Sequence, residues 1–392
     1  MEDKRMKFTL TNDIKTIKNV VKAFTASGDN SKLSFWKINI ETDPAGFVKI
    51  TGQSGTSVLL SADIDEPGKV SMNVQDLVAA LKGIEKTPTF VFADDKDNTI
   101  EVTEADGYSR KAGSWDKYEE SYGPEAYVNV LSFTVSGEDV SRAFSEVIHC
   151  SSDDESRYAM CGVNINLSGL NPAGLNDGSI YAVATDGHRL AWSCICDVGG
   201  RFAGQIHRDN FTVRLIVARF LAETVSKTNN VTFSVFTKED TILKRTKIWY
   251  AVDFGMFHIE DRKEQTGFPE WRRVIPAAER MTGEFTVTAD FVKETDRIAK
   301  TVDKYRKVVI TVSPDGAMAV RTEEAKQAIK AVKNIGTVEP FTFAMNIDYI
   351  RQAVKAAGKR AVRFMFAEPG RPFLTSAGDL TGSVIMPMNL NG

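Results

Sequence analysis

The chain has 392 residues, of which 42% are hydrophobic and 26% are charged. This composition is that of an ordinary globular protein, and the length suits two or three domains. Lys and Arg number 49 against 52 Asp and Glu, a net charge of −3, so a nucleic-acid partner would need cations gathered on one surface. No apolar run reaches membrane-spanning length and the charged N-terminus is unlike a signal peptide, so we expect a cytoplasmic protein that makes no membrane contact.

The cysteines and histidines do not form a recognisable metal-binding pattern. Cys194 and Cys196 are separated by a single residue, and Cys150 and Cys161 stand alone, so the chain contains no CxxC pair. The four histidines are widely scattered along the sequence. We therefore expect no metal site and no cofactor.

A short apolar string recurs before each predicted helix. The copies are Phe8–Leu10, Val70–Met72, Phe133–Val135, Phe211–Val213, Phe285–Val287 and Phe341–Phe343. After each copy, apolar residues recur at spacings of three and four, which predicts an amphipathic helix, and β-branched strand sequence follows. The pattern predicts an α+β protein in which one β-α-β-β-β unit occurs six times. Pairing the units gives three similar domains, over residues 6–128, 129–278 and 279–392.

The first predicted helix runs from about Asn12 to Phe24, and strands are predicted over Leu33–Glu41 and Phe47–Thr51. One face of this helix carries three lysines, which are Lys15, Lys18 and Lys22. In the second repeat, Asn73 is the predicted N-cap of a helix that begins at Val74.

The middle third of the chain differs in charge from the first third. Its first predicted helix begins after Ser136 and has an acidic surface that includes Glu138, Asp139 and Glu146. Two strands are predicted next, over Met160–Leu167 and Ile180–Ala184. A helix over Arg214–Val225 and a long hairpin-like region over Val231–Glu260 complete this third.

The fifth predicted helix, Asp290 to about Lys304, has the clearest pattern. Its apolar stripe contains Phe291, Thr295, Ile298 and Val302, and a second stripe contains Lys293, Arg297, Lys300 and Lys304. The sixth helix repeats this arrangement with Arg351, Lys355 and Lys359. A single charged row is usually a solvated helix face, but rows that recur at equivalent positions of a repeat predict a common cationic surface.

Four further stretches carry a resemblance to a known family. Val183–Ala191 reads Val-Ala-Thr-Asp-Gly-His-Arg-Leu-Ala and matches the most recognisable motif of the bacterial sliding clamps, the β subunits of DNA polymerase III. Val384–Leu390 resembles the C-terminal signature of that family, and Phe268–Pro276 resembles its link between the second and third domains. Met6–Thr9 resembles its usual start.

The resemblance implies a homodimeric ring of three domains per subunit, with helices lining the hole and sheets outside. The ring would encircle double-stranded DNA without sequence preference, because contacts to phosphates carry no sequence information. The candidate DNA-binding residues are Lys15, Lys18, Lys22, Arg214, Lys293, Arg297, Lys300, Arg351 and Lys355.

The resemblance also implies an apolar pocket that receives short peptides from partners. These partners would be the α subunit of the replicative polymerase, the clamp loader and other proteins with a clamp-binding motif. The pocket residues would be Met160, Thr185, Gly187, His188, Arg189, Leu190, Pro269, Arg273, Val274, Val384, Ile385, Met386, Pro387 and Met388. Arg189 and Arg273 could hold polar or carboxylate groups of the peptide. Without the family context, Asp186-Gly187 would be interpreted first as a turn pair.

Some positions depart from the family pattern. Ala159 stands where the family often has a tyrosine, and Asn389 replaces a frequent arginine, so partner preference could differ. Asp29 and residues 153–155 are acidic where family members tend to be neutral or basic near DNA. A clamp-like protein that binds partners without encircling DNA is therefore the alternative.

An enzyme is the alternative from another class, with Asp186 and His188 in a hydrolase site. The sequence lacks G-x-S-x-G, H-E-x-x-H, the P-loop and the dinucleotide-binding motif, so we predict no catalytic residues. Without a P-loop the protein cannot open its own ring by nucleotide hydrolysis. The expected loader must therefore be driven by ATP.

Overall fold

The structure is a computed structural model, and its described residues are 6–19, 37–52, 57–93, 97–118, 128–167, 178–197, 210–225, 230–240, 245–261, 267–315, 317–330, 332–336, 340–368 and 370–390. The chain divides into two compact units, here called unit 1 (Met1–Glu138 and Glu223–Gln265) and unit 2 (Asp139–Ala222 and Thr266–Gly392). The division into three domains stays a prediction.

Unit 1 consists of one antiparallel sheet with helix α2 (Val74–Leu81) packed against it. Its strands are β1 (Met6–Leu10), β2 (Lys37–Asp43), β3 (Phe47–Gly52), β4 (Ser57–Glu66), β5 (Lys69–Asn73), β6 (Pro88–Phe92), β7 (Thr99–Glu104), β8 (Ser109–Lys117), β9 (Val128–Ser136), β14 (Asn230–Asp240), β15 (Arg245–Phe254) and β16 (Phe257–Asp261). Their order is β1-β6-β7-β8-β5-β2-β3-β4-β16-β15-β14-β9, and β1 also pairs with β4. Buried and less buried residues alternate along β1 and β6, so one face of these strands forms the core.

Unit 2 contains a nine-stranded sheet of order β13-β10-β11-β12-β25-β24-β23-β17-β21 and a four-stranded sheet of order β20-β19-β18-β22. The strands are β10 (Gly162–Asn166), β11 (Ser179–Thr185), β12 (Arg189–Asp197), β13 (Asn210–Arg214), β17 (Gly283–Val287), β18 (Lys307–Val312), β19 (Met318–Arg321), β20 (Lys326–Ile329), β21 (Val332–Gly336), β22 (Phe341–Asn346), β23 (Val362–Phe366), β24 (Phe373–Ser376) and β25 (Thr381–Ile385). The helices that lie in or extend into this unit are α3 (Gly137–Val147), α4 (Leu215–Thr224), α5 (Asp290–Glu294) and α6 (Ile347–Ala356), and the short 3₁₀ helices are η2 (Ile148–Cys150), η3 (Glu155–Met160), η5 (Trp271–Val274), η6 (Ala278–Arg280) and η7 (Ile298–Lys300).

The six recurring strings are confirmed as strands that precede helices. They lie in β1, β5, β9, β13, β17 and β22, and the helices after the last five are α2, α3, α4, α5 and α6. After β1 the chain is helical from residue 14 to residue 19, and the rest of the first predicted helix lies outside the described residues, as does the predicted strand sequence before Lys37. The other predicted strands are present, with ends shifted by a few residues. The predicted α+β class is therefore confirmed.

The fifth helix is shorter than the sequence predicts. Helix α5 ends at Glu294, and after a turn the chain forms only the 3₁₀ turn η7. The hydroxyl of Thr295 donates to the carbonyl oxygen of Phe291 at 2.7 Å, and such a back-bond competes with regular helix geometry. The predicted apolar side is nevertheless correct, because Phe291, Thr295 and Ile298 are buried.

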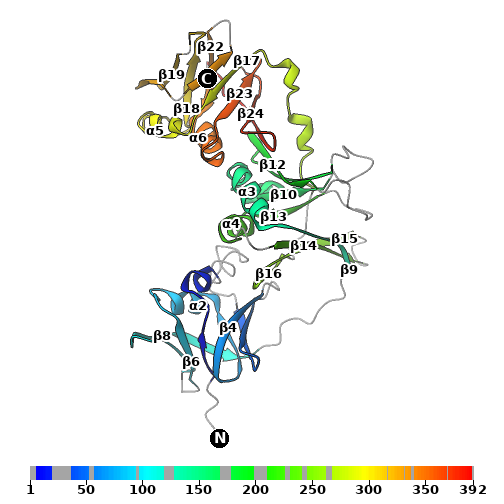
Figure 1. Cartoon of the computed structure of the whole chain (residues 1–392), viewed down its shortest axis with the longest axis vertical. Coiled ribbons are helices and arrows are strands. Elements are labelled where there is room, and N and C mark those ends of the chain that lie inside the picture. The colour runs from blue at the N-terminus through cyan, green and yellow to red at the C-terminus, as the bar shows by residue number, and fades with distance from the viewer. Residues whose placement is uncertain are drawn as a thin grey trace. The chain divides into compact units, whose positions relative to one another are not determined.

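Helices α5 and α6 lie side by side in unit 2 (Figure 1), joined by hydrogen bonds between their side chains and backbone. Their apolar sides pack into a core that contains Phe285, Phe343, Phe364 and Phe373. The rings of Phe285 and Phe364 stack with their centroids 5.1 Å apart. Among the residues that the structure describes, no helix has both the length and the apolar character that crossing a membrane requires.

Candidate functional site

Strands β12 and β25 bring the two recognisable motifs together. The strands pair antiparallel, with Leu190 opposite Val384 and Arg189 opposite Ile385. Just beyond the pairing, the backbone N–H of Met386 donates to the carbonyl oxygen of residue 188 at 3.0 Å. Two sequence stretches almost 200 residues apart therefore form one continuous surface, as the resemblance implies.

The Asp186-Gly187 pair forms a tight turn before β12. Gly187 has a φ of +89°, a conformation that favours glycine. The Asp186 carboxylate accepts hydrogen bonds from the backbone N–H groups of His188 and Arg189 at 2.9 and 3.0 Å. Arg157 donates to the carbonyl oxygen of Asp186 at 3.0 Å. The turn is thus held from two sides, and it directs the His188 side chain to the surface.

Arg189 does not present free donors at this surface. Its Nε donates to Asp186 at 2.9 Å and its Nη1 donates to Gln352 on α6. The guanidinium also lies 4.2 Å from the ring centroid of Tyr349, a cation–π distance. Because the Arg189 side chain is only 10% exposed, the structure assigns it to joining the turn to α6. The expectation that Arg189 holds groups of a peptide stays a prediction.

The 3₁₀ helix η5 covers one face of β11 and β12. Trp271 packs with Val183, Leu190 and Phe268 in a buried cluster. Its ring centroid lies 5.9 Å from that of Trp192. Leu190 is therefore part of a buried cluster, and its role in a peptide pocket stays a prediction.

The predicted pocket residues fall into three classes of exposure. Exposed are Gly187, His188, Pro269, Arg273, Val274 and Met386, half-buried are Met160, Arg189, Pro387 and Met388, and buried are Thr185, Leu190, Val384 and Ile385. Val274 is 55% and Met386 is 41% exposed, which is high for apolar side chains. We name this area, defined by Met160, His188, Val274, Met386 and Met388, the apolar motif surface. Its role in binding stays a prediction.

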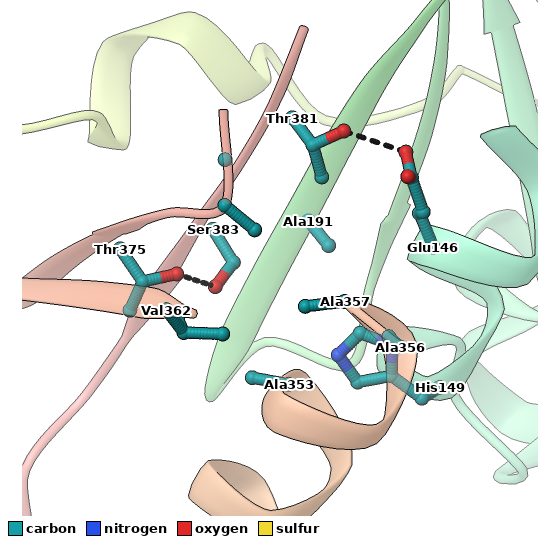
Figure 2. Close-up of a pocket in the computed structure, with 12 residues that line it drawn as sticks. Glu146, His149, Ala191, Ala353, Ala356, Ala357, Val362, Thr375, Thr381 and Ser383 are labelled. Atoms are coloured by element: carbon teal, nitrogen blue, oxygen red, sulfur yellow. Dashed lines mark hydrogen bonds between the residues drawn. The ribbon is translucent and has the colours of Figure 1, made fainter. Parts of the chain in front are cut away.

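A small cavity lies behind this surface, on the other face of β12 and β25 (Figure 2). Ala191 and Ser383 line it, because successive residues of a strand point to opposite faces. Glu146 and His149 line it from α3 and η2. The Nδ1 atom of His149 is fully buried without a hydrogen-bond partner.

Glu146 on α3 contacts β12, β25 and the loop after α6 at this cavity. Its carboxylate accepts from Ser193 at 2.6 Å and from Thr381 at 2.5 Å, and it pairs with Arg142 and Arg360. Burial opposes ionisation, but the hydrogen bonds from Ser193 and Thr381 and the charge of Arg360 hold the pKa of Glu146 below its usual range. The sequence analysis placed Glu146 on an acidic surface, and this is wrong, because the residue is 4% exposed.

Known proteins share this architecture and part of this sequence. The β sliding clamp of Pseudomonas aeruginosa is 23% identical to the chain over 348 residues, which is 84% of each protein. The β sliding clamp of Caulobacter vibrioides is 28% identical over 226 residues, 57% of this chain and 56% of the relative. No protein-family model matches the chain.

Solved clamp structures match almost the whole chain. A sliding clamp from P. aeruginosa bound to griselimycin gives a TM-score of 0.74 at 16% identity and covers 98% of this chain and 100% of its own. The β subunit of DNA polymerase III from Borrelia burgdorferi, in complex with a natural product, gives 0.73 at 17% identity, with 98% and 99% covered. The chain is thus similar to β sliding clamps in sequence and has their fold.

The cationic candidates for DNA binding differ in accessibility. Lys15 and Lys18 are exposed on the helical segment after β1, whereas Lys22 lies outside the described residues. Arg214 is half-buried at the end of β13.

The candidates of the last third cluster on α5, η7 and α6. Lys293, Arg297, Lys300 and Lys355 are exposed, and we name them the α5–α6 cationic face. Arg351 belongs to the same helix as Lys355, but its side chain is only 11% exposed and its donors are used within the protein. Arg351 is therefore far less accessible than Lys355, and a role of Arg351 in binding DNA stays a prediction.

Two kinds of functional residue were missed by the sequence analysis. Gln352 and Tyr349 hold Arg189, and Glu146 supports β12 and β25, yet none of them belongs to a family motif quoted above. Glu146 stands near the C-terminal end of a helix whose other face is apolar. Nothing in the local sequence indicated that its carboxylate is buried. Within the described ranges, no three His, Cys, Asp or Glu side chains are grouped so that they could hold a metal ion.

Proposed function

We propose that this protein is a DNA polymerase processivity factor, a sliding clamp that encircles duplex DNA as a homodimeric ring. The observation that carries the proposal is the conjunction, in one chain, of six strand–helix repeats with two clamp motifs joined on neighbouring strands. Three domains over residues 6–128, 129–278 and 279–392 would each supply two repeats to the ring.

The apolar motif surface would bind the partner peptide. Val274 and Met386 offer exposed apolar area, and methionine adapts its shape to different partners. Arg273 is exposed and lies in the last turn of η5, so it can pair with a carboxylate of the peptide. The partners would be the α subunit of the replicative polymerase, the clamp loader and other proteins that carry a clamp-binding motif.

The α5–α6 cationic face, with Lys15 and Lys18, would contact DNA phosphates. Contacts of lysine and arginine to phosphates are independent of sequence, and they allow a ring to slide. Because the ring would be retained by topology, the contacts need only be weak. The net charge of −3 is compatible with this arrangement, since a uniformly basic protein would also bind DNA on its outside.

The protein would have no catalytic activity of its own and would act in the cytoplasm. Relatives named β sliding clamp support an accessory role in replication. Opening of the ring would depend on a loader that hydrolyses ATP.

Retention on circular DNA tests the proposal. The protein, loaded onto a nicked circular plasmid by a clamp loader, should stay bound during gel filtration and should dissociate when a restriction enzyme linearises the plasmid. Equal retention on linear and circular DNA would contradict encirclement. Loss from both, with peptide binding intact, would favour a clamp-like protein that binds partners only.

A further inference from the structure

The segment that carries most of the α5–α6 cationic face cannot hold its shape alone. Helix α5 has five residues and η7 has three. Isolated helices shorter than about 12 residues are marginal in water, so the directions of these lysines and arginines must come from tertiary contacts. Phe291 and Ile298 anchor the apolar side in the core. The polar side of this segment needs anchors as well, in the form of hydrogen bonds or ion pairs.

Arg351 on α6 supplies one of them. Its Nη1 donates to the carbonyl oxygen of Val292 and to the hydroxyl of Thr295, both at 2.8 Å. Its Nη2 donates to the carboxylate of Asp296, with which it forms an ion pair. The last carbonyl groups of a helix lack intrahelical partners and attract cations, so this guanidinium caps the C-terminal end of α5.

The position of Asp296 gives this contact a second consequence. Asp296 follows Lys293 by three residues and precedes Lys300 by four, which are the spacings at which side chains of a helical segment meet. The hydrogen bond from Arg351 holds the pKa of Asp296 below its usual range, and the charges of Lys300 and Lys355 act in the same direction. Without Arg351, the carboxylate of Asp296 could pair with lysines of the α5–α6 cationic face.

We propose that Arg351 is a positioning residue for DNA contact, which engages the carboxylate of Asp296 and so leaves Lys300 and Lys355 available for phosphates. This inference rests on the proposed function, since it assumes that the α5–α6 cationic face meets DNA. Arg351 itself does not contact phosphates, because its side chain is 11% exposed and its two terminal nitrogens already donate to three acceptors.

Arg306 provides a natural comparison, because it is an anchor that does not touch Asp296. It donates to Asp348 at the start of α6 through Nε at 2.6 Å and Nη2 at 3.0 Å. Its Nη1 donates to the carbonyl oxygen of Ala299 at 2.9 Å, at the end of η7. Both arginines thus tie this segment to α6, but only Arg351 occupies the carboxylate that lies among the lysines.

The test combines Arg351→Met with Asp296→Asn in the full-length homodimer. Methionine keeps much of the apolar stem of arginine and removes the donors, and asparagine removes the charge that Arg351→Met would release. The measured quantity is the equilibrium constant for binding to a linear duplex at several salt concentrations, because topology sets the retention on a circle. Each phosphate contact that is lost lowers the magnitude of the slope of log binding constant against log salt by about 0.9.

We expect Arg351→Met to lower the magnitude of this slope by the value of about one to two phosphate contacts. The double variant should recover most of the wild-type slope. Lys355→Met is the matched control on the same helix: it should lower the slope by about one contact, and Asp296→Asn should not restore it. Arg306→Met should lower thermal stability without a comparable change in the slope.

Two results would overturn the inference. If the double variant stays as defective as Arg351→Met, Arg351 acts on DNA directly or through helix geometry. If Arg351→Met leaves the slope unchanged while it binds partner peptide normally, then Asp296 does not compete with phosphates for the lysines. Should Arg351→Met fail to fold, Arg351→Gln keeps a neutral donor and is compared with and without Asp296→Asn in the same assay. Failure of the wild-type protein to remain on any circular DNA would refute the proposed function instead.

Discussion

Removing the carboxylate of Glu146 should destabilise unit 2 far more than removing an exposed carboxylate. Glu146→Ala takes the acceptor from the hydroxyls of Ser193 and Thr381, and Ser193 is fully buried at 0% exposure. A buried donor left without a partner costs about 1–3 kcal/mol. Arg360 is 42% exposed and can return to water at little cost. We therefore expect a loss of about 2–4 kcal/mol for Glu146→Ala and about 1–2 kcal/mol for Glu146→Gln, which keeps one acceptor.

Glu284 offers a matched control in the same unit. It pairs with Arg363 at 2.7 Å, but both side chains are exposed, at 38% and 54%. Glu284→Ala should change the unfolding free energy by less than about 0.5–1 kcal/mol. Urea unfolding followed by tryptophan fluorescence reports on unit 2 through Trp192 and Trp271, which lie next to β25 and in η5.

Peptide affinity should change together with the unfolding free energy of unit 2 in these variants. Glu146 holds β12 and β25 from behind, and these strands carry the apolar motif surface, so peptide affinity should fall with Glu146→Ala and stay unchanged with Glu284→Ala. Equal unfolding free energies for the two alanine variants would refute the reasoning, since it would mean that the buried network contributes no more than a solvated pair.

Three further outcomes are expected. Burial lowers the pKa of His149 to about 3 from about 6.5 in the unfolded chain, so the unfolded state binds a proton that the folded state does not. Stability should therefore fall as the pH drops below about 6.5, by about 2 kcal/mol at pH 5, and a pH series of unfolding curves should lose this slope in His149→Phe. Lys293→Glu combined with Lys300→Glu should weaken binding to linear duplex DNA and leave peptide affinity unchanged, whereas equal loss of both would contradict separate sites. Val274→Glu, or deletion of residues 386–392, should abolish peptide binding measured by fluorescence anisotropy without changing the affinity for linear duplex DNA, and normal binding after loss of Met386 would count against the surface.

The sequence was most informative where a local pattern is tied to local geometry. The strings at Phe133–Val135 and Phe285–Val287 are confirmed as strands before helices, because alternation and helical spacing depend on neighbouring residues only. The turn at Asp186-Gly187 was also predictable, since glycine tolerates its positive φ and aspartate can accept from the following N–H groups. The pairing of this motif with Val384 came from the family resemblance.

Which charged side chains are accessible was decided by tertiary structure alone. Arg351 and Lys355 are one helical turn apart and look equivalent in sequence, yet Arg351 caps α5 and Lys355 is exposed. Glu146 lies on the same helix as Glu138, and it meets hydroxyls from β12 and β25 and an arginine from the loop after α6.

By itself, then, the sequence determined the repeat and the class of fold, because these depend on patterns that a single segment contains. It did not determine which of its cations and carboxylates pair with each other. That choice depends on partners more than 50 residues away, such as Arg351 with Asp296 and Arg360 with Glu146. The physical reason is that burying a charge is costly unless a partner of opposite charge is brought to it, and only the folded chain brings these partners together.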